Sequence, residues 1–439
     1  MTYEEMEKQV MGKVNLRLLP YLIFVYFVCY LDRVNVGFAA LTMNKDLGFT
    51  ATMYGWGAGI FFLAYFMFEV PSNILLEKFG ARRWIARIMV SWGLVSTLMF
   101  MVQGVTSFLA CRFLLGVAEA GFFPGIIFYF TNWYPAHHRA KVVSRFMIAT
   151  PFASMIGSPL SAWILGLDGW MGLAGWKWLF ILEGFPAVIC GVITFYYLTD
   201  RPRDAKWLQP EEREWLQTRL DQERAKVESV RKYKLKDALL SGHVFVLALI
   251  YLSTQITTYG FNMWIPQIVK NFGGFSNLEV GFIAAIPFLC AGIGMVIWGY
   301  SSDRNMERKW HLIVAMTLAG SGLIASSFFP NSPMAAIICM SFSAIGIWSL
   351  LGVFWTLPPM FLTGAAAAGG IALVNSVGNL GGFFGPFAMG WLKDATGSFS
   401  AGLVAIGSAI IVGAFLAYLL TSSLQKTEKV PAAKTQAPG

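Results

Sequence analysis

A short charged segment occurs twice in the chain, as NILLEKFGARRW at residues 73–84 and as GYSSDRNMERKW at residues 299–310. The two copies begin 226 residues apart (299 − 73). An unrelated pair of small-residue strings, MIGSPL around Pro159 and FFGPF around Pro386, is separated by 227 residues (386 − 159). Two independent offsets that agree to one residue predict that the chain is built from two repeated halves.

The sequence around these segments is strongly apolar. Of 439 residues, 56% are hydrophobic and 13% are charged, whereas soluble globular proteins carry about 25% charged residues. A membrane-spanning helix needs about 20 apolar residues. The composition therefore excludes an ordinary cytosolic enzyme and predicts an all-α integral membrane protein. Twelve transmembrane helices are expected near residues 17–40, 55–77, 83–103, 107–130, 142–165, 176–199, 241–269, 278–300, 311–330, 333–357, 368–392 and 398–422.

The basic residues of the connecting loops alternate between the two sides of the membrane. One side carries Lys78, Arg82, Arg83, Arg87, Arg139, Lys141, Arg145, the charged loop 200–237, Arg304, Arg308 and Lys309. The other side carries only Lys45, Lys177, Lys270 and Lys393. Basic loops lie in the cytoplasm by the positive-inside rule. We therefore expect a multi-pass protein of the cell inner (plasma) membrane with both termini in the cytoplasm.

The repeat and the charged loop divide the chain into four parts. These are an N-terminal six-helix half (1–199), a cytoplasmic loop (200–240), a C-terminal six-helix half (241–424) and a disordered cytoplasmic tail (425–439). Within the loop, Pro210 followed by Glu211 and Glu212 favours the start of a helix, because proline and acidic residues suit a first helical turn. We expect an amphipathic helix over about 210–228 in an otherwise solvated tether.

The second copy of the repeated segment carries the pattern G-x-x-x-D-R-x-x-x-R-K at Gly299, Asp303, Arg304, Arg308 and Lys309, and the first copy keeps it only in part. With this pattern the chain resembles the major facilitator superfamily, and in more detail its anion:cation symporter branch. The matching strings are YLDRVNVGFA (30–39), FEVPSNILLEKFGARRWIAR (68–87), RFLLGVAEAGFFPG (112–125), DRPRDAKWLQPEEREWL (200–216) and NSVGNLGGFFGP (375–386). Within the branch, the chain is most similar to bacterial tartrate-type (organic anion/proton) permeases.

The resemblance implies the major facilitator fold, with twelve transmembrane helices in two pseudo-symmetric six-helix halves. It also implies transport by alternating access around a central site. Phthalate, nicotinate and sugar-acid (galactonate, glucarate) carriers belong to the same branch.

Independently of any resemblance, four ionisable residues stand deep in apolar spans: Asp32, Arg33, Arg112 and Glu119. Each costs about 2.5–3.5 kcal/mol at the centre of a membrane helix. Such residues usually mark a transport pathway or a proton relay, and the alternative is a structural ion-pair network. As a set, two carboxylates and two guanidinium groups cancel in charge.

Each of these side chains has an expected role. The planar, permanently charged guanidinium of Arg33 suits a carboxylate, so we expect Arg33 to bind an anionic substrate. Asp32 and Glu119 are expected to carry the coupling protons, because a desolvated carboxyl group can be protonated near neutral pH. Arg112 lies on the same helix face as Glu119, seven residues earlier, and is expected to tune it. The resemblance implies the same roles.

The C-terminal half has no buried charge at the positions equivalent to these four. It is expected to contribute neutral contacts, with Asn375 and Asn379 on one helix face. The resemblance places Asn375 and Tyr65 at the substrate. Tyr30 shares a helix face with Arg33, and the cavity candidates on weaker grounds are Trp355, Trp348, Tyr259, Thr150 and Gln255.

The repeated loop segments are expected to lock the cytoplasmic side through charge pairs. The gating residues are Glu77, Arg82, Arg83, Asp303, Arg304 and Arg308. His137 and His138 stand at a loop edge and are interpreted as a solvated face. His243 and His311 stand at the starts of predicted spans and no histidine lies deep within one, so we expect no metal centre and no cofactor, with H⁺ as the coupling ion.

These features favour a secondary active transporter that takes up a small organic carboxylate with protons, with a tartrate-like hydroxy acid as the first substrate choice. An aromatic carboxylate such as phthalate or nicotinate, or a sugar acid, remains open. A channel or a transporter-like sensor is the alternative without carrier activity, and an enzyme is not expected because no catalytic cluster is recognised. The expected partners are the substrate, protons and the lipid bilayer, with no nucleic acid, and the functional unit is expected to be a monomer.

Overall fold

The computed structural model describes residues 2–230, 242–357 and 364–428, and these residues contain helices and no strands. In the N-terminal half the helices are α1 (Tyr3–Leu47), α2 (Ala51–Phe79), α3 (Ala81–Leu98), α4 (Val105–Glu119), α5 (Phe122–Thr131), α6 (Ala136–Met147), α7 (Ala149–Leu165) and α8 (Gly175–Tyr197). The loop contains α9 (Pro210–Val230). The C-terminal half contains α11 (Gly242–Asn271), α12 (Asn277–Asn305), α13 (Lys309–Ser326), α14 (Pro333–Phe354), α16 (Gly364–Asn379), α17 (Gly381–Thr396) and α18 (Ser400–Glu428). Three short 3-10 turns, Met99–Met101, Trp170–Gly172 and Pro202–Asp204, connect some of these helices.

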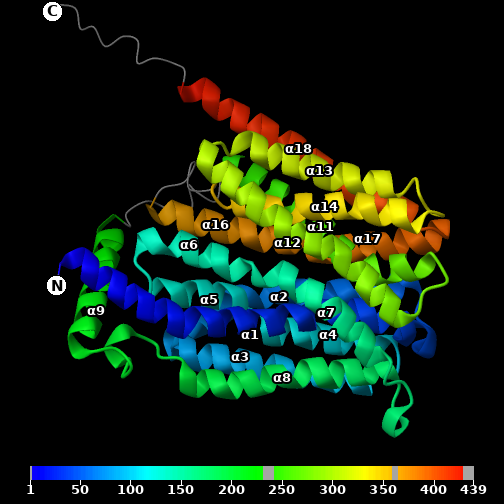
Figure 1. Ribbon diagram of the computed structural model, residues 1–439, viewed down its shortest axis with the longest axis horizontal. Coiled ribbons are helices and arrows are strands. Elements are labelled where there is room, and N and C mark those ends of the chain that lie inside the picture. Colours follow the sequence, from blue (N-terminus) through cyan, green and yellow to red (C-terminus); the bar gives the residue numbers. More distant parts are fainter. Residues whose placement is uncertain (1, 231–241, 358–363, 429–439) are drawn as a thin grey trace, which may run out of the picture.

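The two halves lie side by side as two layers of roughly parallel helices (Figure 1). Helices α1 to α8 form one layer and α11 to α18 form the other. The N-terminus and α9 lie at the same end of the bundle, which we call the α9 end. The division into two halves at the charged loop follows the predicted organisation. Residues 231–240 of the predicted loop and most of the predicted tail lie outside the described residues.

Ten helical stretches among the described residues are long and apolar enough to cross a membrane. Helix α13 and the pair α16 and α17 supply the remaining two of the twelve spans of the fold. The outer faces of the bundle are apolar. Helix α12, for example, exposes Ile286, Leu289, Ile293 and Val296. An apolar surface of this extent is incompatible with water and matches lipid chains.

Besides the span that is interrupted at Ile148 between α6 and α7, two spans are broken close to the centre of the bundle. Helix α4 ends at Glu119, and α5 begins at Phe122 after Gly121, which has a left-handed φ of 86°. A side chain at Gly121 would also collide with Ser72, since its Cβ would lie 2.5 Å from the Ser72 hydroxyl oxygen. The second break separates α16 from α17 at Leu380. Broken spans are tolerated in membrane proteins where the backbone is buried in protein or lines a cavity.

The halves are joined at the end of the bundle opposite α9. The Tyr54 hydroxyl donates to the backbone carbonyl of Met263 at 2.9 Å. Asp394, at the end of α17, accepts the backbone N–H groups of Ala51 and Thr52 at 3.1 and 2.7 Å. These two residues begin α2, whose N-terminal dipole favours a carboxylate. Hydrogen bonding to Thr52 overcomes the opposing effect of burial and lowers the pKa of Asp394.

The predicted loop helix is confirmed, because α9 covers Pro210–Val230. It is not a free tether. Glu212 is buried and accepts hydrogen bonds from Gln9 and Lys13 of α1 at 2.8 and 2.7 Å. Burial alone would raise the pKa of Glu212, but the bonds from Lys13, Gln9 and the Gln209 backbone lower it. Helix α9 is therefore docked on the N-terminal half.

Candidate functional site

A central cavity with an empty volume of about 690 Å³ lies between the two halves. The N-terminal half contributes Tyr26, Tyr30, Arg33, Phe62, Tyr65, Phe123, Met147 and Thr150 to its lining. The C-terminal half contributes Tyr251, Gln255, Thr258, Tyr259, Trp348, Leu351, Trp355, Asn375 and Asn379. The volume is within the range of about 300–1,000 Å³ that small-molecule sites occupy. The residues predicted to bind substrate all lie in this lining: Arg33, Tyr30, Tyr65, Asn375, Asn379 and Trp355. The weaker candidates Trp348, Tyr259, Thr150 and Gln255 lie in it too.

Arg33 is the one cationic side chain among the lining residues in the described part of the chain. It is 8% exposed and forms a buried ion pair, through Nη2, with Oε1 of Glu119. Its Nη1 donates to the Tyr259 hydroxyl at 3.1 Å. Nε of Arg33 and Oε2 of Glu119 have no hydrogen-bond partner. The guanidinium is thus held by residues of both halves and keeps an unused donor.

The ring of Phe61 lies between the two buried guanidinium groups. The Cζ atoms of Arg33 and Arg112 are 5.4 and 5.1 Å from the ring centroid. Tyr65 lies on the cavity side, with its centroid 5.5 Å from Arg33 Cζ. Cation–π contacts of this kind stabilise a desolvated cation by about 2 kcal/mol. They help to hold two positive charges in one apolar region.

Arg112 does not bond to Glu119, although both lie on α4. Its Nε and Nη2 donate to the backbone carbonyls of Gly57 and Ala58 on α2, at 3.1 and 3.2 Å. The long side chain reaches sideways to the neighbouring helix, because the close packing of Gly57 leaves carbonyl oxygens within its range. Arg112 therefore clamps α2 to α4, and the Glu119 carboxylate is held by Arg33 instead.

Asp32 lies outside the cavity lining and forms no ion pair among the residues that the structure describes. Its Oδ1 accepts hydrogen bonds from the hydroxyl of Ser96 and, at 3.2 Å, from the amide of Asn35. The sequence predicts that Asp32 carries a coupling proton and that its charge cancels within the set of four buried residues. In this structure it faces neutral donors, because consecutive residues of a helix point in different directions and only Arg33 faces the cavity.

Two buried carboxylates were missed by the sequence analysis. Glu69 of α2 is 4% exposed and accepts hydrogen bonds from the side-chain amides of Asn375 and Asn379, at 2.9 and 3.4 Å. Glu183 of α8 is 2% exposed and accepts from the Ser161 hydroxyl at 2.7 Å. Both fall inside predicted spans, so a complete search of those spans for acidic residues would have found them. The prediction of four buried charges that cancel is wrong on this count.

The Glu69 bonds join the halves from the side of the cavity nearer the α9 end. Asn375 and Asn379 line the cavity, as expected, but their amide nitrogens point to Glu69 in this structure. Their carbonyl oxygens remain for other contacts. A ligand that needs an amide donor here would have to compete with Glu69.

The expected gating residues are only partly paired. Asp303 and Arg308 form an ion pair at 2.7 Å, and Arg308 also donates to the Ser302 hydroxyl at 2.7 Å. The backbone N–H of Arg82 donates to Asp200 Oδ1 at 2.8 Å, so this segment is tied to the start of the charged loop. The remaining gating candidates Glu77, Arg83 and Arg304 are exposed. The described pairs lie within one half each.

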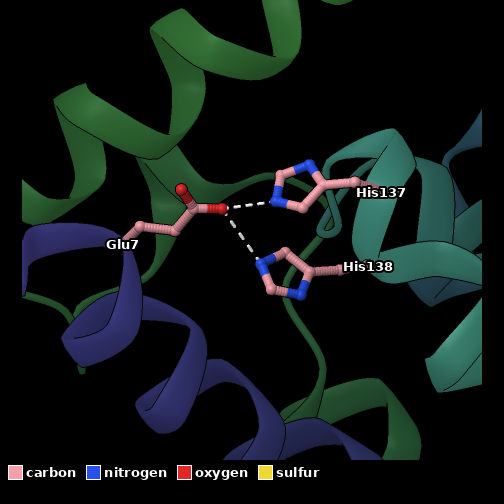
Figure 2. A group of neighbouring side chains, drawn as sticks. All are labelled: Glu7, His137 and His138. Carbon is pink, nitrogen blue, oxygen red and sulfur yellow. Dashed lines mark hydrogen bonds and ion pairs between the residues drawn. The ribbon is translucent and has the colours of Figure 1, made fainter. Parts of the chain in front are cut away.

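His137 and His138 are not a purely solvated face. Their Nε2 atoms lie 2.5 and 3.0 Å from the same oxygen of Glu7, on the first turns of α1 (Figure 2). The His residues begin α6, so the contact links the start of the chain to a distant helix. The physical reason is the length of α1, which extends well beyond the predicted span and brings Glu7 alongside α6.

Comparison with known proteins agrees with this fold. The chain matches the family described as Major Facilitator Superfamily over residues 22–357 and 247–438. A protein of Agrobacterium vitis named "Putative tartrate transporter" is 49% identical, over 95% of this chain and 96% of the relative. A "Quinolone resistance transporter" of Acinetobacter baumannii is 45% identical, over 97% and 98%. "Inner membrane transport protein RhmT" of Escherichia coli is 37% identical, over 94% and 95%.

Solved structures show the same architecture. A bacterial homolog of the human lysosomal transporter Spinster, inward-facing and unoccupied, matches with a TM-score of 0.77 and 16% identity, over 94% of this chain and 98% of that chain. A D-xylose-proton symporter matches with a TM-score of 0.74 and 15% identity, over 92% and 97%. At these identities the likeness concerns the fold alone. Together with the family match and the central cavity, it identifies the chain as a multi-pass membrane transporter that belongs to the major facilitator superfamily.

Proposed function

We propose that the protein takes up a small organic carboxylate together with protons by alternating access, and that the preferred substrate is a tartrate-like hydroxy acid. The observation that carries this proposal is the ion pair between Arg33 and Glu119 at the wall of the cavity. A positively charged side chain at the wall of a cavity between two mobile halves is suited to binding an anionic substrate. The name of the Agrobacterium vitis relative supports tartrate.

The pair also supplies a route to proton coupling. A carboxylate substrate and the carboxylate of Glu119 compete for the same guanidinium. When a proton binds to Glu119, the attraction to Arg33 falls and the guanidinium becomes free to form a bidentate contact with the substrate. The unpartnered Oε2 of Glu119 is a position for that proton. Loss of the proton restores the ion pair and expels the anion, so proton and substrate move together.

The rest of the cavity suits a polar substrate with an apolar side. Tyr30, Tyr65 and Tyr259 place hydroxyl groups around Arg33, and the Tyr30 hydroxyl is held from the opposite half by the Asn262 amide at 3.0 Å. Hydroxyl groups of a hydroxy acid can exchange hydrogen bonds with these phenols. Closure of the cavity around the substrate would draw the two halves together at these residues.

Uptake by purified protein in liposomes tests the proposal. Reversal of the imposed pH gradient, so that the more acidic side changes from one side of the membrane to the other, should reverse the direction of labelled tartrate accumulation. Glu119→Gln should retain exchange of labelled for unlabelled tartrate, because exchange needs no proton release, and should lose accumulation driven by the pH gradient. Unchanged pH dependence in Glu119→Gln would contradict the coupling role, and absence of exchange in the wild type would exclude a tartrate carrier.

An aromatic carboxylate is the second candidate, because nine of the seventeen lining residues are aromatic: Tyr26, Tyr30, Phe62, Tyr65, Phe123, Tyr251, Tyr259, Trp348 and Trp355. The name of the Acinetobacter baumannii relative connects that protein with resistance to quinolones. Stacking between rings contributes about 0.5–1.5 kcal/mol beyond burial. Competition of phthalate, nicotinate and tartrate for the same labelled substrate decides between the two, since the preferred class inhibits at the lower concentration.

We further propose that the α9 end faces the cytoplasm. The basic loops gather there, and the positive-inside rule assigns them to that side. In this orientation both termini are cytoplasmic and the contact between Asp394 and α2 closes the outer side. Labelling of single cysteines placed at residues 5 and 397 by a membrane-impermeant reagent in intact cells tests the assignment.

A further inference from the structure

Glu7, His137 and His138 form a compact cluster of metal-ligating side chains outside the central cavity (Figure 2). Each side chain offers one ligand atom, and these atoms all lie within 4.8 Å of one another. No other group of this kind occurs in the part of the chain that the structure describes. All three residues lie outside the predicted spans, on which the expectation of no metal centre was based. The proposed transport of a carboxylate gives the cluster no role.

The two imidazole rings converge on one carboxylate oxygen. Nε2 of His137 and Nε2 of His138 lie 2.5 and 3.0 Å from Oε1 of Glu7. The centroids of the two rings are only 4.2 Å apart, although consecutive residues of a helix point in directions that differ by about 100°. Both side chains are therefore turned toward the same point. Ligand atoms from two helices, α1 and α6, surround that point.

Helix α9 holds the backbone on both sides of the cluster. Glu223 of α9 accepts the backbone N–H of Ala136, at the start of α6, at 3.0 Å. The same carboxylate pairs with Arg139 at 3.4 Å, so the cationic residue that follows the histidines is already balanced. Glu212 of α9 accepts from the Gln9 side chain of α1 at 2.8 Å. The helices that carry the ligands are thereby held in place, as a metal site requires.

We propose that Glu7, His137 and His138 bind a divalent transition-metal ion such as Zn²⁺. Zinc binds histidine nitrogen and carboxylate oxygen at about 2.0–2.2 Å, so two ligand atoms of a tetrahedral site lie about 3.3 Å apart. The two nitrogen–oxygen contacts have to open by less than about 1 Å to reach this separation. The side chains of His137 and His138 are 51% and 30% exposed, so they can turn and an ion can reach them from water.

The ligand atoms determine the class of ion. Imidazole nitrogen suits zinc, copper and nickel, whereas Mg²⁺ and Ca²⁺ prefer oxygen ligands alone. A neutral imidazole that keeps its hydrogen on Nδ1 presents a free lone pair at Nε2. Two such lone pairs and the negative oxygen of Glu7 repel one another, and a cation between them removes this repulsion. Three protein ligands leave the fourth position of a tetrahedral ion to water.

A bound ion would fasten the start of α1 to the start of α6. The ligands that it joins are 130 residues apart in sequence. Both helices continue to the cavity lining, α1 through Tyr30 and Arg33 and α6 through Met147. The ion therefore acts on two helices of the cavity wall without contact to the substrate.

Calorimetric titration of the purified protein with Zn²⁺, in detergent micelles and without a polyhistidine tag, tests the site. The wild type should bind one ion, and excess Mg²⁺ should not compete. His137→Gln, His138→Gln and Glu7→Gln should each weaken binding by at least about tenfold, because the loss of an outer-shell partner alone costs about 10–100-fold.

His311→Gln is the matched control. His311 lies 2.7 Å from Glu307, and in the described residues no third ligand joins this pair. His311→Gln should therefore bind Zn²⁺ as the wild type does. Absence of Zn²⁺ binding to the wild type, or unchanged affinity in His137→Gln and His138→Gln, would overturn the proposal.

Hydrogen exchange shows where the ion acts. Zn²⁺ should slow the exchange of backbone amides in the first turns of α1 and α6 of the wild type, and it should not do so in His138→Gln. Protection that is absent from both helices, or equal in wild type and His138→Gln, would overturn the assignment. Neither measurement uses a substrate, so the result does not depend on the proposed function.

Discussion

Removal of the Arg33 guanidinium should destabilise the protein through the charge that it leaves behind. Glu119 is fully buried, and its ionised carboxylate has Arg33 as its ion-pair partner. Breaking a buried pair by removing one partner costs about 3–5 kcal/mol. The hydrogen bond to the Tyr259 hydroxyl adds about 1 kcal/mol. We expect Arg33→Gln to lower the free energy of unfolding by roughly the sum of these two contributions.

The double variant Arg33→Gln/Glu119→Gln removes both charges and isolates this effect. It should recover most of the lost stability, because two amides can bond to each other and no unpaired charge remains. It should not recover substrate binding, since Arg33 is the cationic residue of the described cavity lining.

Unfolding of the purified wild type, both single variants and the double variant in detergent micelles measures these differences. Stabilisation by added tartrate reports binding in the same experiment. The reasoning is refuted if Arg33→Gln is as stable as wild type, because no unbalanced buried charge would then remain at Glu119. It is also refuted if the double variant is no more stable than Arg33→Gln.

Three further predictions concern other parts of the molecule. Asn375→Leu removes the amide that donates to Glu69 at 2.9 Å and should lower the free energy of unfolding by about 1–3 kcal/mol. The double variant Asn375→Leu/Glu69→Met should regain this stability, which thermal unfolding measures. Glu212→Gln should loosen α9, measured by its hydrogen exchange. Because the pKa of Glu212 is lowered in the folded protein, its contribution is present above its unfolded pKa and is lost as the pH falls through the folded one, so wild type and variant should converge in acid. Gly116→Ala should prevent normal folding, because its Cβ would meet the Phe61 carbonyl and lie 2.9 Å from the Ala64 Cβ. Gly12 has open space around it, so the control variant Gly12→Ala should express normally.

The sequence predicted the fold and the cavity well for a physical reason. Apolar spans and basic loops follow from the hydrocarbon layer itself, which acts on every residue of a span and not on particular contacts. The substrate-binding candidates were found because ionisable or amide groups are rare in such spans. Arg33, Asn375 and Asn379 stand out in the sequence for this reason, and all three line the cavity.

The partners of these groups could not be predicted in the same way. Residues of one helix that share a face can still bond to different neighbours, so Arg112 binds carbonyls of α2 while Glu119 binds Arg33. The contact of Asn375 with Glu69 joins residues 306 positions apart and depends on how the two halves close. Glu183 was missed for a different reason. Its position is plain in the sequence, but the neighbouring residues of the span are so apolar that one carboxyl group does not interrupt the hydrophobic pattern.

The hydrogen bond between Arg33 and Tyr259 joins equivalent positions of the two repeats, because 259 − 33 equals the repeat offset of 226. Gly37 and Met263 have the same offset (263 − 37), and a Cβ at Gly37 would lie 3.0 Å from the Met263 carbonyl oxygen. Equivalent residues touch only where the local twofold axis passes. Two identical halves with arginine at this position would therefore place arginine against arginine, with like charges in contact. Divergence of the two halves at this position leaves a single guanidinium beside the axis, where it donates to the Tyr259 hydroxyl of the other half.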